Sequence, residues 1–207
     1  GSAYIFERPA IGPEQSIDIA FHHDTFANSG DPYSDGSVTA AATAGHIYSD
    51  TSTGKYTWGS LDSASTASNQ TTYTWTPANS LTNVDILMVA GGGAGAGCWH
   101  GGGGGAGGLL HHTNQSLSGQ KTIVVGNGGA QNGGQPGSWY NGYNTEFTGL
   151  TTAVGGGKGG TDCSKPGPGS AGGSGGGATG YSNGSGGSAT SGQGNTGGGG
   201  VNGRLGN

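Results

Sequence analysis

The amino-acid composition of the chain changes abruptly within Val84-Asp85-Ile86-Leu87-Met88-Val89-Ala90-Gly91-Gly92-Gly93-Ala94-Gly95-Ala96-Gly97. The first half of this stretch is apolar and β-prone, and the second half is glycine and alanine only. Residues 1–90 contain 7 glycines, whereas residues 91–207 contain the other 45 of a total of 52. The sequence therefore predicts that the chain is held together differently on the two sides of this step.

The composition provides too few apolar residues for an ordinary hydrophobic core. Leu, Ile, Val and Phe together make 26 of 207 residues, and a fraction below about 20% usually indicates disorder. Disordered chains also carry high net charge, but here only 8% of residues are charged and the formal net charge is −5. We therefore expect a folded chain.

Charge and hydropathy also exclude two classes of partner. Lys and Arg residues do not cluster, so the sequence gives no basis for nucleic-acid binding. The longest apolar run, 84–90, is far shorter than the roughly 20 residues of a membrane span. The chain starts at Gly1 without a leader segment, so we expect a processed product or a fragment.

Short β-prone runs bounded by Asn, Asp, Ser and Gly predict strands. The expected strands are 4–7, 16–21, 55–58, 71–76 and 84–89, followed by 121–125 and 145–154. No run has convincing helical periodicity. The predicted fold class is all-β.

Glycine tracts lie between and after the later strands. They are 91–97, 101–108, 126–137, 155–160 and 167–200, interrupted almost only by small or uncharged residues. A flexible linker is the alternative reading, but a linker has no reason to alternate with strands. Collagen is excluded because the glycines keep no strict third-residue register and only 7 prolines are present.

A left-handed helix with three residues per turn explains such tracts physically. Its N–H and C=O groups point sideways, and they need partners when they are buried. Neighbouring helices of this kind can bond to each other laterally, and glycine lets their backbones approach closely. We expect a packed bundle of these polyglycine II helices, supported by the strands.

The order of elements resembles a known family. Thr71-Thr72-Tyr73-Thr74-Trp75-Thr76-Pro77 and the strand 84–90 precede the first tract, and Ile123-Val124-Val125-Gly126-Asn127-Gly128-Gly129 follows. This pattern is similar to the glycine-rich domain of phage and algal-virus structural proteins and bacterial surface proteins. It also resembles the glycine-rich domain of anaplastic lymphoma kinase-type receptors and the tip adhesins of phage tail fibres.

The resemblance covers about residues 71–207 and divides the chain into two parts. We expect a β-rich N-terminal region, 1–70, for attachment or assembly, and a glycine-rich domain, 71–207. The resemblance implies a β-sandwich-like framework that carries the polyglycine II bundle and displays binding loops. These loops would contact a host surface polysaccharide or protein.

Non-glycine islands in the tracts are the candidate receptor-binding positions. They supply Trp139, Tyr140, Asn141, Tyr143, Trp99, His100, His111, His112 and Tyr181. Aromatic residues interleaved with Asn, Ser and Gly suit sugars and proteins at low ordering cost. Alternatively, Trp139 and Tyr140 fill a small apolar core, and Trp99 packs over a disulfide or a tract end.

The two cysteines, Cys98 and Cys163, are compatible with one disulfide or with two free thiols. No metal site is expected, because His22-His23 and His111-His112 are adjacent pairs that point to opposite faces of a strand. The loop 155–160 lacks the Ser or Thr that follows the lysine in a phosphate-binding loop. No cofactor is expected, and the absence of a nucleophile elbow argues against an enzyme.

These observations predict a virion-surface or other extracellular structural protein, such as a phage fibre or appendage component that displays receptor-binding loops. Its partners would include other subunits of the virion or appendage, and it would be oligomeric or mounted on an oligomer. One alternative is an architectural capsid-decoration or filament subunit without a ligand. Another is an antifreeze-like protein.

Overall fold

The computed structural model describes residues 1–7, 18–22, 59–67, 69–77, 80–97, 100–132, 138–161, 167–180 and 184–201. These residues form strands, turns and extended segments and contain no helix, in agreement with the predicted all-β class. Accordingly, the described part of the chain has no helix that could cross a membrane.

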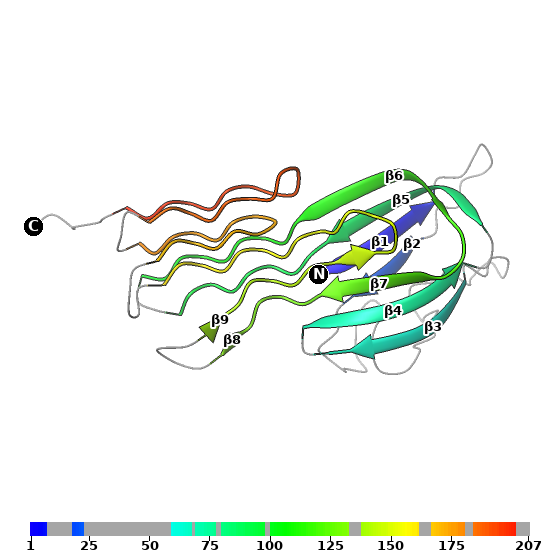
Figure 1. Cartoon of the computed structure of the whole chain (residues 1–207), viewed down its shortest axis with the longest axis horizontal. Coiled ribbons are helices and arrows are strands. Elements are labelled where there is room, and N and C mark those ends of the chain that lie inside the picture. The colour runs from blue at the N-terminus through cyan, green and yellow to red at the C-terminus, as the bar shows by residue number, and fades with distance from the viewer. Residues whose placement is uncertain are drawn as a thin grey trace, which may run out of the picture.

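Two four-stranded antiparallel sheets form one end of the molecule (Figure 1). The first has the order β2-β1-β5-β6, and the second has the order β10-β7-β4-β3. The strands of the first are β1 (Ser2–Glu7), β2 (Asp18–His22), β5 (Leu81–Val89) and β6 (Leu109–Leu117). Those of the second are β3 (Gly59–Thr66), β4 (Gln70–Pro77), β7 (Lys121–Gly126) and β10 (Glu146–Phe147). A separate hairpin pairs β8 (Gln131–Asn132) with β9 (Ser138–Trp139).

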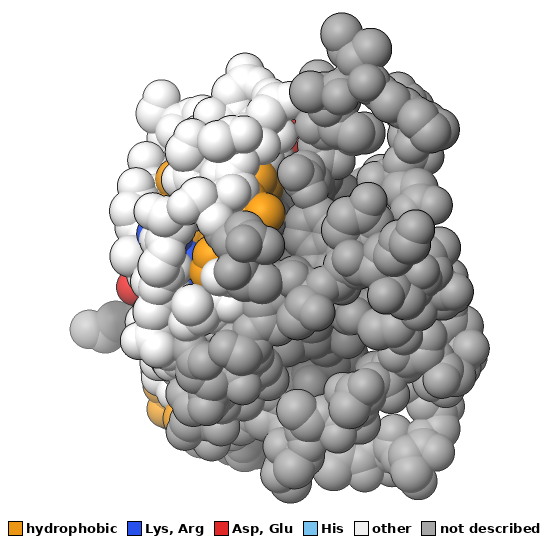
Figure 2. Space-filling model, turned by 90° about the vertical axis from the view of Figure 1, so that its right-hand side faces the viewer, with side chains coloured by type: hydrophobic (Ala, Val, Ile, Leu, Met, Phe, Trp, Pro, Cys, Tyr) orange, Lys and Arg blue, Asp and Glu red, His pale blue; other side chains and the backbone are white. Residues whose placement is uncertain are grey.

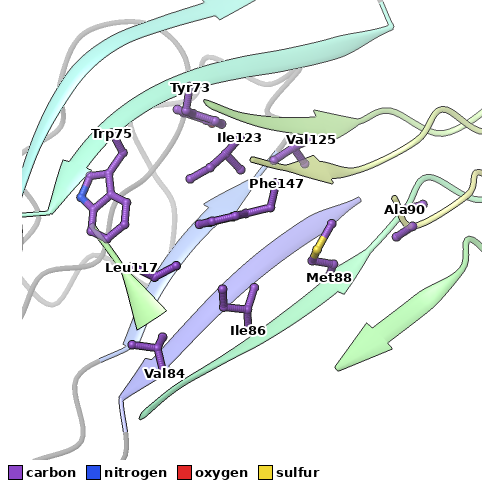
Figure 3. Close-up of a cluster of buried hydrophobic side chains, with 11 residues drawn as sticks. Tyr73, Trp75, Val84, Ile86, Met88, Ala90, Leu117, Ile123, Val125 and Phe147 are labelled. Atoms are coloured by element: carbon purple, nitrogen blue, oxygen red, sulfur yellow. The ribbon is translucent and has the colours of Figure 1, made fainter. Parts of the chain in front are cut away.

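Both sheets contribute to one buried hydrophobic cluster. Alternate residues of β4 are buried, and so are Val84, Ile86 and Met88 of β5 and Ile123 and Val125 of β7, as expected for strands with one face on a core. In Figure 3 the side chains of the two sheets point toward one another. The cluster consists of Tyr73, Trp75, Val84, Ile86, Met88, Ala90, Leu117, Ile123, Val125, Phe147 and Ala153.

Most of the predicted strands within the described residues are confirmed. Those at 4–7, 16–21, 71–76, 84–89 and 121–125 correspond to β1, β2, β4, β5 and β7. The expected strand 55–58 lies outside the described residues. The single strand expected at 145–154 is wrong, because the chain reverses after β10 at Gly149, whose φ is +86°. Ala153 then pairs back with Thr145. Strands β3 and β6 were not predicted.

Strands on both sides of residue 70 share the two sheets. β1 pairs with β5, and β3 pairs with β4. The strand pairing therefore joins residues 1–7 and 59–66 to the later part of the chain. The division at residue 70 remains a prediction.

The glycine tracts run side by side away from the sheets (Figure 1) and bond to each other through the backbone. The tract 90–97 donates from Ala90, Gly93 and Ala96 to the carbonyl groups of tract 101–108, with N···O distances of 2.8–3.0 Å. Its Gly91 and Ala94 donate instead to tract 140–144. Donors that are three residues apart therefore reach the same neighbouring tract.

The tract 153–161 lies in the middle of this network and shows the same spacing on three sides. Gly156 and Gly159 donate to tract 90–97, and Gly157 and Gly160 donate to tract 173–180. The third side faces tract 140–144, where the acceptors are side-chain oxygens of asparagine. All four of these glycines are buried. The interior of this end of the molecule is thus made mainly of backbone, with only a few buried apolar side chains such as Ala94 and Ala178.

Close approach explains why the central positions are glycine. A Cβ atom on Gly156 would meet the carbonyl oxygen of Gly105 and the backbone nitrogen of Gly93 at distances below 3.0 Å. On the exposed Gly95, a Cβ atom would meet its nearest atoms at 3.9 Å, an ordinary contact. The two glycines belong to hydrogen-bonded neighbouring tracts, yet only Gly156 lacks space for a methyl group.

We predict that Gly156→Ala lowers the free energy of unfolding by about 1–3 kcal/mol or more, because overpacking forces the neighbouring backbone apart. The matched variant Gly95→Ala should change it by less than about 0.5 kcal/mol. Urea denaturation followed by circular dichroism measures both. Equal tolerance of the two substitutions would show that the tracts are not closely packed.

Candidate functional site

The described ends of several tracts lie together on the side of the molecule away from the sheets, which we call the distal end (Figure 1). The carbonyl group of His100 accepts hydrogen bonds from the N–H of Gly180 (2.8 Å) and from the Thr179 hydroxyl (2.9 Å). Gly167 donates to the carbonyl of Thr161 (2.9 Å), and Thr179 donates to Gly167 (3.4 Å). These contacts bring segments far apart in sequence together at one end.

The hairpin β8–β9 adds two aromatic residues to this end. Trp139 is 8% exposed, and its indole Nε1 is buried without a hydrogen-bond partner among the described residues. A Cβ atom on Gly97 would meet the side chains of Gln131 and Trp139, so the indole lies against the end of tract 90–97. Tyr140, in contrast, is 43% exposed. Of these two candidates, Tyr140 is the one whose side chain is open to a ligand.

Asn141 and Asn144 use their side chains to hold the tracts together. The Oδ1 atoms of Asn141 and Asn144 accept hydrogen bonds from the N–H groups of Lys158 and Gly155, each at 2.9 Å. The Nδ2 group of Asn141 also donates to the carbonyl of Ala171 at 3.5 Å. Asn141 was predicted from the sequence as a receptor-binding residue, and its polar atoms are engaged in these internal bonds.

Buried Gln193 has a comparable role that sequence reasoning missed. Its Oε1 accepts from the N–H of Val154 (2.8 Å), and its Nε2 donates to the carbonyl of Thr152 (2.9 Å). Asparagine and glutamine within a glycine tract are the available sequence signal, because their amide groups mimic a peptide bond. Assigning such a role also needs the register between tracts, which the sequence does not contain.

The remaining candidates fall into different surroundings. Tyr143 is half-buried in tract 140–144, where its N–H donates to Asn127 and its carbonyl accepts from Gly91, both at 3.0 Å. The side chain of His100 is exposed at the distal end. Trp99, Tyr181, Cys98 and Cys163 lie outside the described residues.

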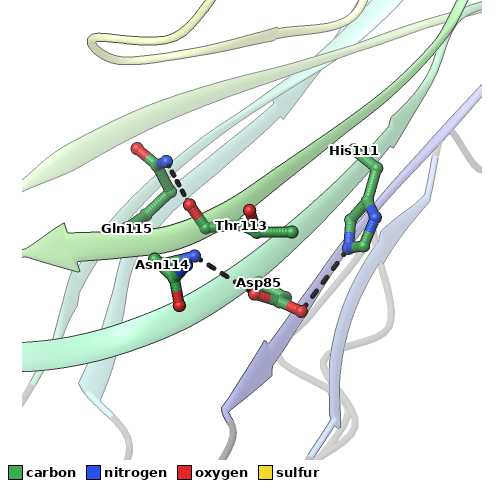
Figure 4. Close-up of polar contacts among 5 residues, drawn as sticks. All are labelled: Asp85, His111, Thr113, Asn114 and Gln115. Carbon is green, nitrogen blue, oxygen red and sulfur yellow. Dashed lines mark hydrogen bonds and ion pairs between the residues drawn. The ribbon is translucent and has the colours of Figure 1, made fainter.

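His111 and His112, which are also candidate receptor-binding residues, lie on β6 within a sheet and not in a loop of the tract bundle. The Nε2 atom of His111 is 3.6 Å from the Oδ2 atom of Asp85, which is 4% exposed (Figure 4). The other oxygen of Asp85 accepts the N–H of Asn114 at 3.2 Å. Asn114 has a φ of +56° at an irregularity in the β5–β6 pairing, which turns its N–H toward the carboxylate. His112 is half-buried, and its Nε2 has no partner among the described residues.

The structure thus brings Trp139, Tyr140, Asn141 and His100 to the tract bundle and leaves the two histidines of β6 in the sheet. Within the described ranges, no group of three or more His, Cys, Asp or Glu side chains could hold a metal ion. On the end face formed by the sheets, the described residues present mainly uncharged polar side chains and backbone (Figure 2). A small group of hydrophobic side chains lies among them.

A family model for the glycine-rich domain matches residues 65–207. The chain belongs to this glycine-rich domain family. The matched region begins within β3 and includes both the later strands of the sheets and all the described tracts. Comparisons with curated proteins and with solved structures give no match.

Burial predicts opposite effects for the two neighbouring aromatic residues of the glycine-rich domain. Trp139→Ala should lower the free energy of unfolding by about 3–5 kcal/mol, the usual range for a buried large aromatic residue. Tyr140→Ala should change it by less than about 1 kcal/mol. Thermal and urea unfolding provide the measurement, and a larger loss for Tyr140→Ala than for Trp139→Ala would contradict the assignment.

Asn141 allows a test of its internal role. Asn141→Ala removes an acceptor for Lys158 and a donor for Ala171, and should cost about 1 kcal/mol of stability. Asn141→Asp keeps the acceptor and should cost less than Asn141→Ala. Ser116→Ala, an exposed change on β6, serves as the control in the same denaturation assay. Unchanged stability of both Asn141 variants would mean that the side chain is free to serve a ligand.

Proposed function

We propose that this chain is a structural protein of a virion or cell surface whose glycine-rich domain displays receptor-binding loops. In this proposal the two sheets form a β-sandwich-like framework, and the tracts form a bundle of polyglycine II helices. The protein is extracellular or virion-exposed, is not an enzyme and is mounted on an oligomer. The receptor is a host polysaccharide or surface protein.

The spacing of the backbone hydrogen bonds supports the polyglycine II packing. Donors that are three residues apart bond to the same neighbouring tract, and a helix with three residues per turn repeats its direction at that interval. Such a helix has no internal hydrogen bonds, so the lateral bonds are the ones that order it. The shared hydrophobic cluster of the two sheets supports the sandwich-like framework.

The meeting of tract ends at the distal end is the observation that carries the display role. His100, Thr179 and Gly180 are joined by hydrogen bonds there, and the exposed Tyr140 follows the nearby hairpin. Loops positioned by a rigid scaffold are common binding sites. The family resemblance to phage and viral surface proteins points in the same direction.

A purely architectural subunit is the second candidate function. The outward faces of the tracts carry small uncharged residues, such as Gly92, Gly95, Ser185 and Ser188, which are all exposed. A surface of this kind suits packing between subunits without a separate ligand. The two functions differ in whether the distal end binds a host receptor.

Binding of the full chain to a panel of bacterial surface polysaccharides and purified outer-surface proteins tests the display role. We predict that His100→Ala combined with Tyr140→Ala weakens binding at least tenfold, because truncation of an interface hot spot typically costs about 2 kcal/mol or more. Leu109→Ala is the matched control, since Leu109 is 51% exposed but lies on β6 in the sheet. Equal binding by the two variants would contradict the distal site, and no binding to the panel would favour the architectural function.

A further inference from the structure

One tract of the bundle is enclosed by neighbours on all sides but one. In tract 173–180, Ser174 and Gly177 donate to the carbonyl groups of Ala106 and Gly103 in tract 101–108, at 2.9 and 2.8 Å. Gly175 and Ala178 donate to tract 193–200, at 3.0 and 2.9 Å. Further hydrogen bonds join tract 173–180 to tracts 153–161, 167–172 and 184–189.

The side between tracts 101–108 and 193–200 is open. A Cβ atom on Gly103 or on Gly198 would meet nothing within 4 Å, and both glycines are exposed. A Cβ atom on Gly177 would lie between the two tracts, 3.5 Å from the Gly103 nitrogen and 3.9 Å from the Gly198 oxygen. We call this recess the glycine groove: its floor is tract 173–180, and its walls are tracts 101–108 and 193–200.

The walls of the glycine groove carry backbone N–H groups that can still donate hydrogen bonds. Gly103 and Gly198 accept hydrogen bonds through their carbonyl groups, but their N–H groups have no partner among the described residues. The half-buried Gly177 and Ser174 on the floor are three residues apart, the repeat of the tracts. The groove therefore continues the packing pattern of the interior at the surface.

A comparable recess elsewhere in the bundle is closed by the protein itself. It lies along tract 153–161, between tracts 140–144 and 167–172, and the Asn141 side chain bridges it by bonding to Lys158 and Ala171. The glycine groove has no such side chain at its centre, where Gly103, Gly177 and Gly198 meet. One recess is sealed by an amide group, and the other is lined by glycine at its centre. One repeat away from Gly177, the Ser174 hydroxyl accepts a hydrogen bond from the N–H of Asn195 at 3.2 Å.

An occupant of the glycine groove needs a backbone without side chains on its contact face. The chain itself offers one, because Gly101, Gly103, Gly104 and Ala106 of tract 101–108 are exposed. This tract forms hydrogen bonds with tracts 90–97, 153–161 and 173–180, so it stands on the outside of the bundle as a ridge. The ridge is also one wall of the groove, so a two-fold axis beside it would place each ridge in the groove of the other copy.

We propose that the chain self-associates by inserting tract 101–108 of one copy into the glycine groove of a second copy. Isologous contacts of this kind are the commonest symmetric interface. Gly103, Ala106, Ser174, Gly177, Asn195 and Gly198 are all uncharged, so no like-charge repulsion opposes the contact. The inference extends the proposed polyglycine II packing and is independent of receptor binding at the distal end.

Sedimentation equilibrium of the full chain, with a reducing agent present to exclude intermolecular disulfides, tests the proposal. The wild-type chain should associate reversibly into dimers. Gly103→Gln and Gly198→Gln place a side chain on either wall, where nothing lies within 4 Å, so each should weaken dimerisation by at least about tenfold, or about 1.4 kcal/mol. Gly128→Gln is the control, since its Cβ atom would make one ordinary contact of 3.6 Å in a tract away from the groove.

Thermal unfolding of each variant distinguishes a variant that no longer dimerises from one that no longer folds. It therefore also distinguishes failure of the dimer proposal from failure of the proposed packing within one chain. Monomeric Gly103→Gln with an unchanged melting temperature, beside dimeric Gly128→Gln, is the expected result. If one wall variant unfolds, the variant of the other wall provides the test. A wild-type chain that stays monomeric overturns the proposal whatever the variants do, as does dimerisation that both wall variants leave unchanged.

Discussion

Hydrogen bonds that run sideways between glycine tracts are the constraint on which the rest of the structure depends. Tract 153–161 bonds to its neighbours through Gly156, Gly157, Gly159 and Gly160, and these residues are buried among other backbones. A Cβ atom at Gly156 would collide with a neighbouring carbonyl group. The high glycine content therefore follows from packing distance and does not indicate flexibility.

This way of packing has an energetic consequence that explains the two sheets. A typical intramolecular hydrogen bond contributes only about 0.5–1.5 kcal/mol net, whereas ordering one residue of backbone costs about 1–2 kcal/mol, and glycine loses the most freedom. Lateral hydrogen bonds alone therefore contribute little net free energy of folding after the cost of ordering the backbone. The apolar cluster built by Tyr73, Trp75, Ile86, Ile123 and Phe147 supplies burial that the tracts lack. The sheets also fix the direction in which the tracts start. Ala90, for example, belongs to the hydrophobic cluster and is also the first residue of tract 90–97.

The sequence predicted those parts of the fold whose signals are local. The apolar run before Gly91 became β5, and the runs at 71–76 and 121–125 became β4 and β7. β6 was not predicted because Leu109–Leu117 is mostly polar. Five of its nine residues are exposed, and it is a strand through its pairing with β5. The reversal at Gly149 was missed because a positive φ can be recognised only when the backbone is known.

The candidate site was less predictable than the fold, because its residues depend on contacts between distant segments. Aromatic composition singled out Trp139 and Tyr140, but the folded chain buries Trp139 beside Gly97 and leaves Tyr140 exposed. The same holds for Asn141, whose amide acts as a stand-in peptide group between two tracts. In a bundle of this kind the role of each polar side chain follows from the register of the tracts.

Amide hydrogen exchange, measured residue by residue by NMR, tests the lateral packing most directly. The account predicts slow exchange for the N–H groups of Gly156, Gly157, Gly159 and Gly160, close to the rate set by global unfolding. The exposed Gly92 and Gly95, whose N–H groups have no partner among the described residues, should exchange rapidly. Uniformly fast exchange along all these tracts would contradict the central claim that the glycine backbone forms the interior.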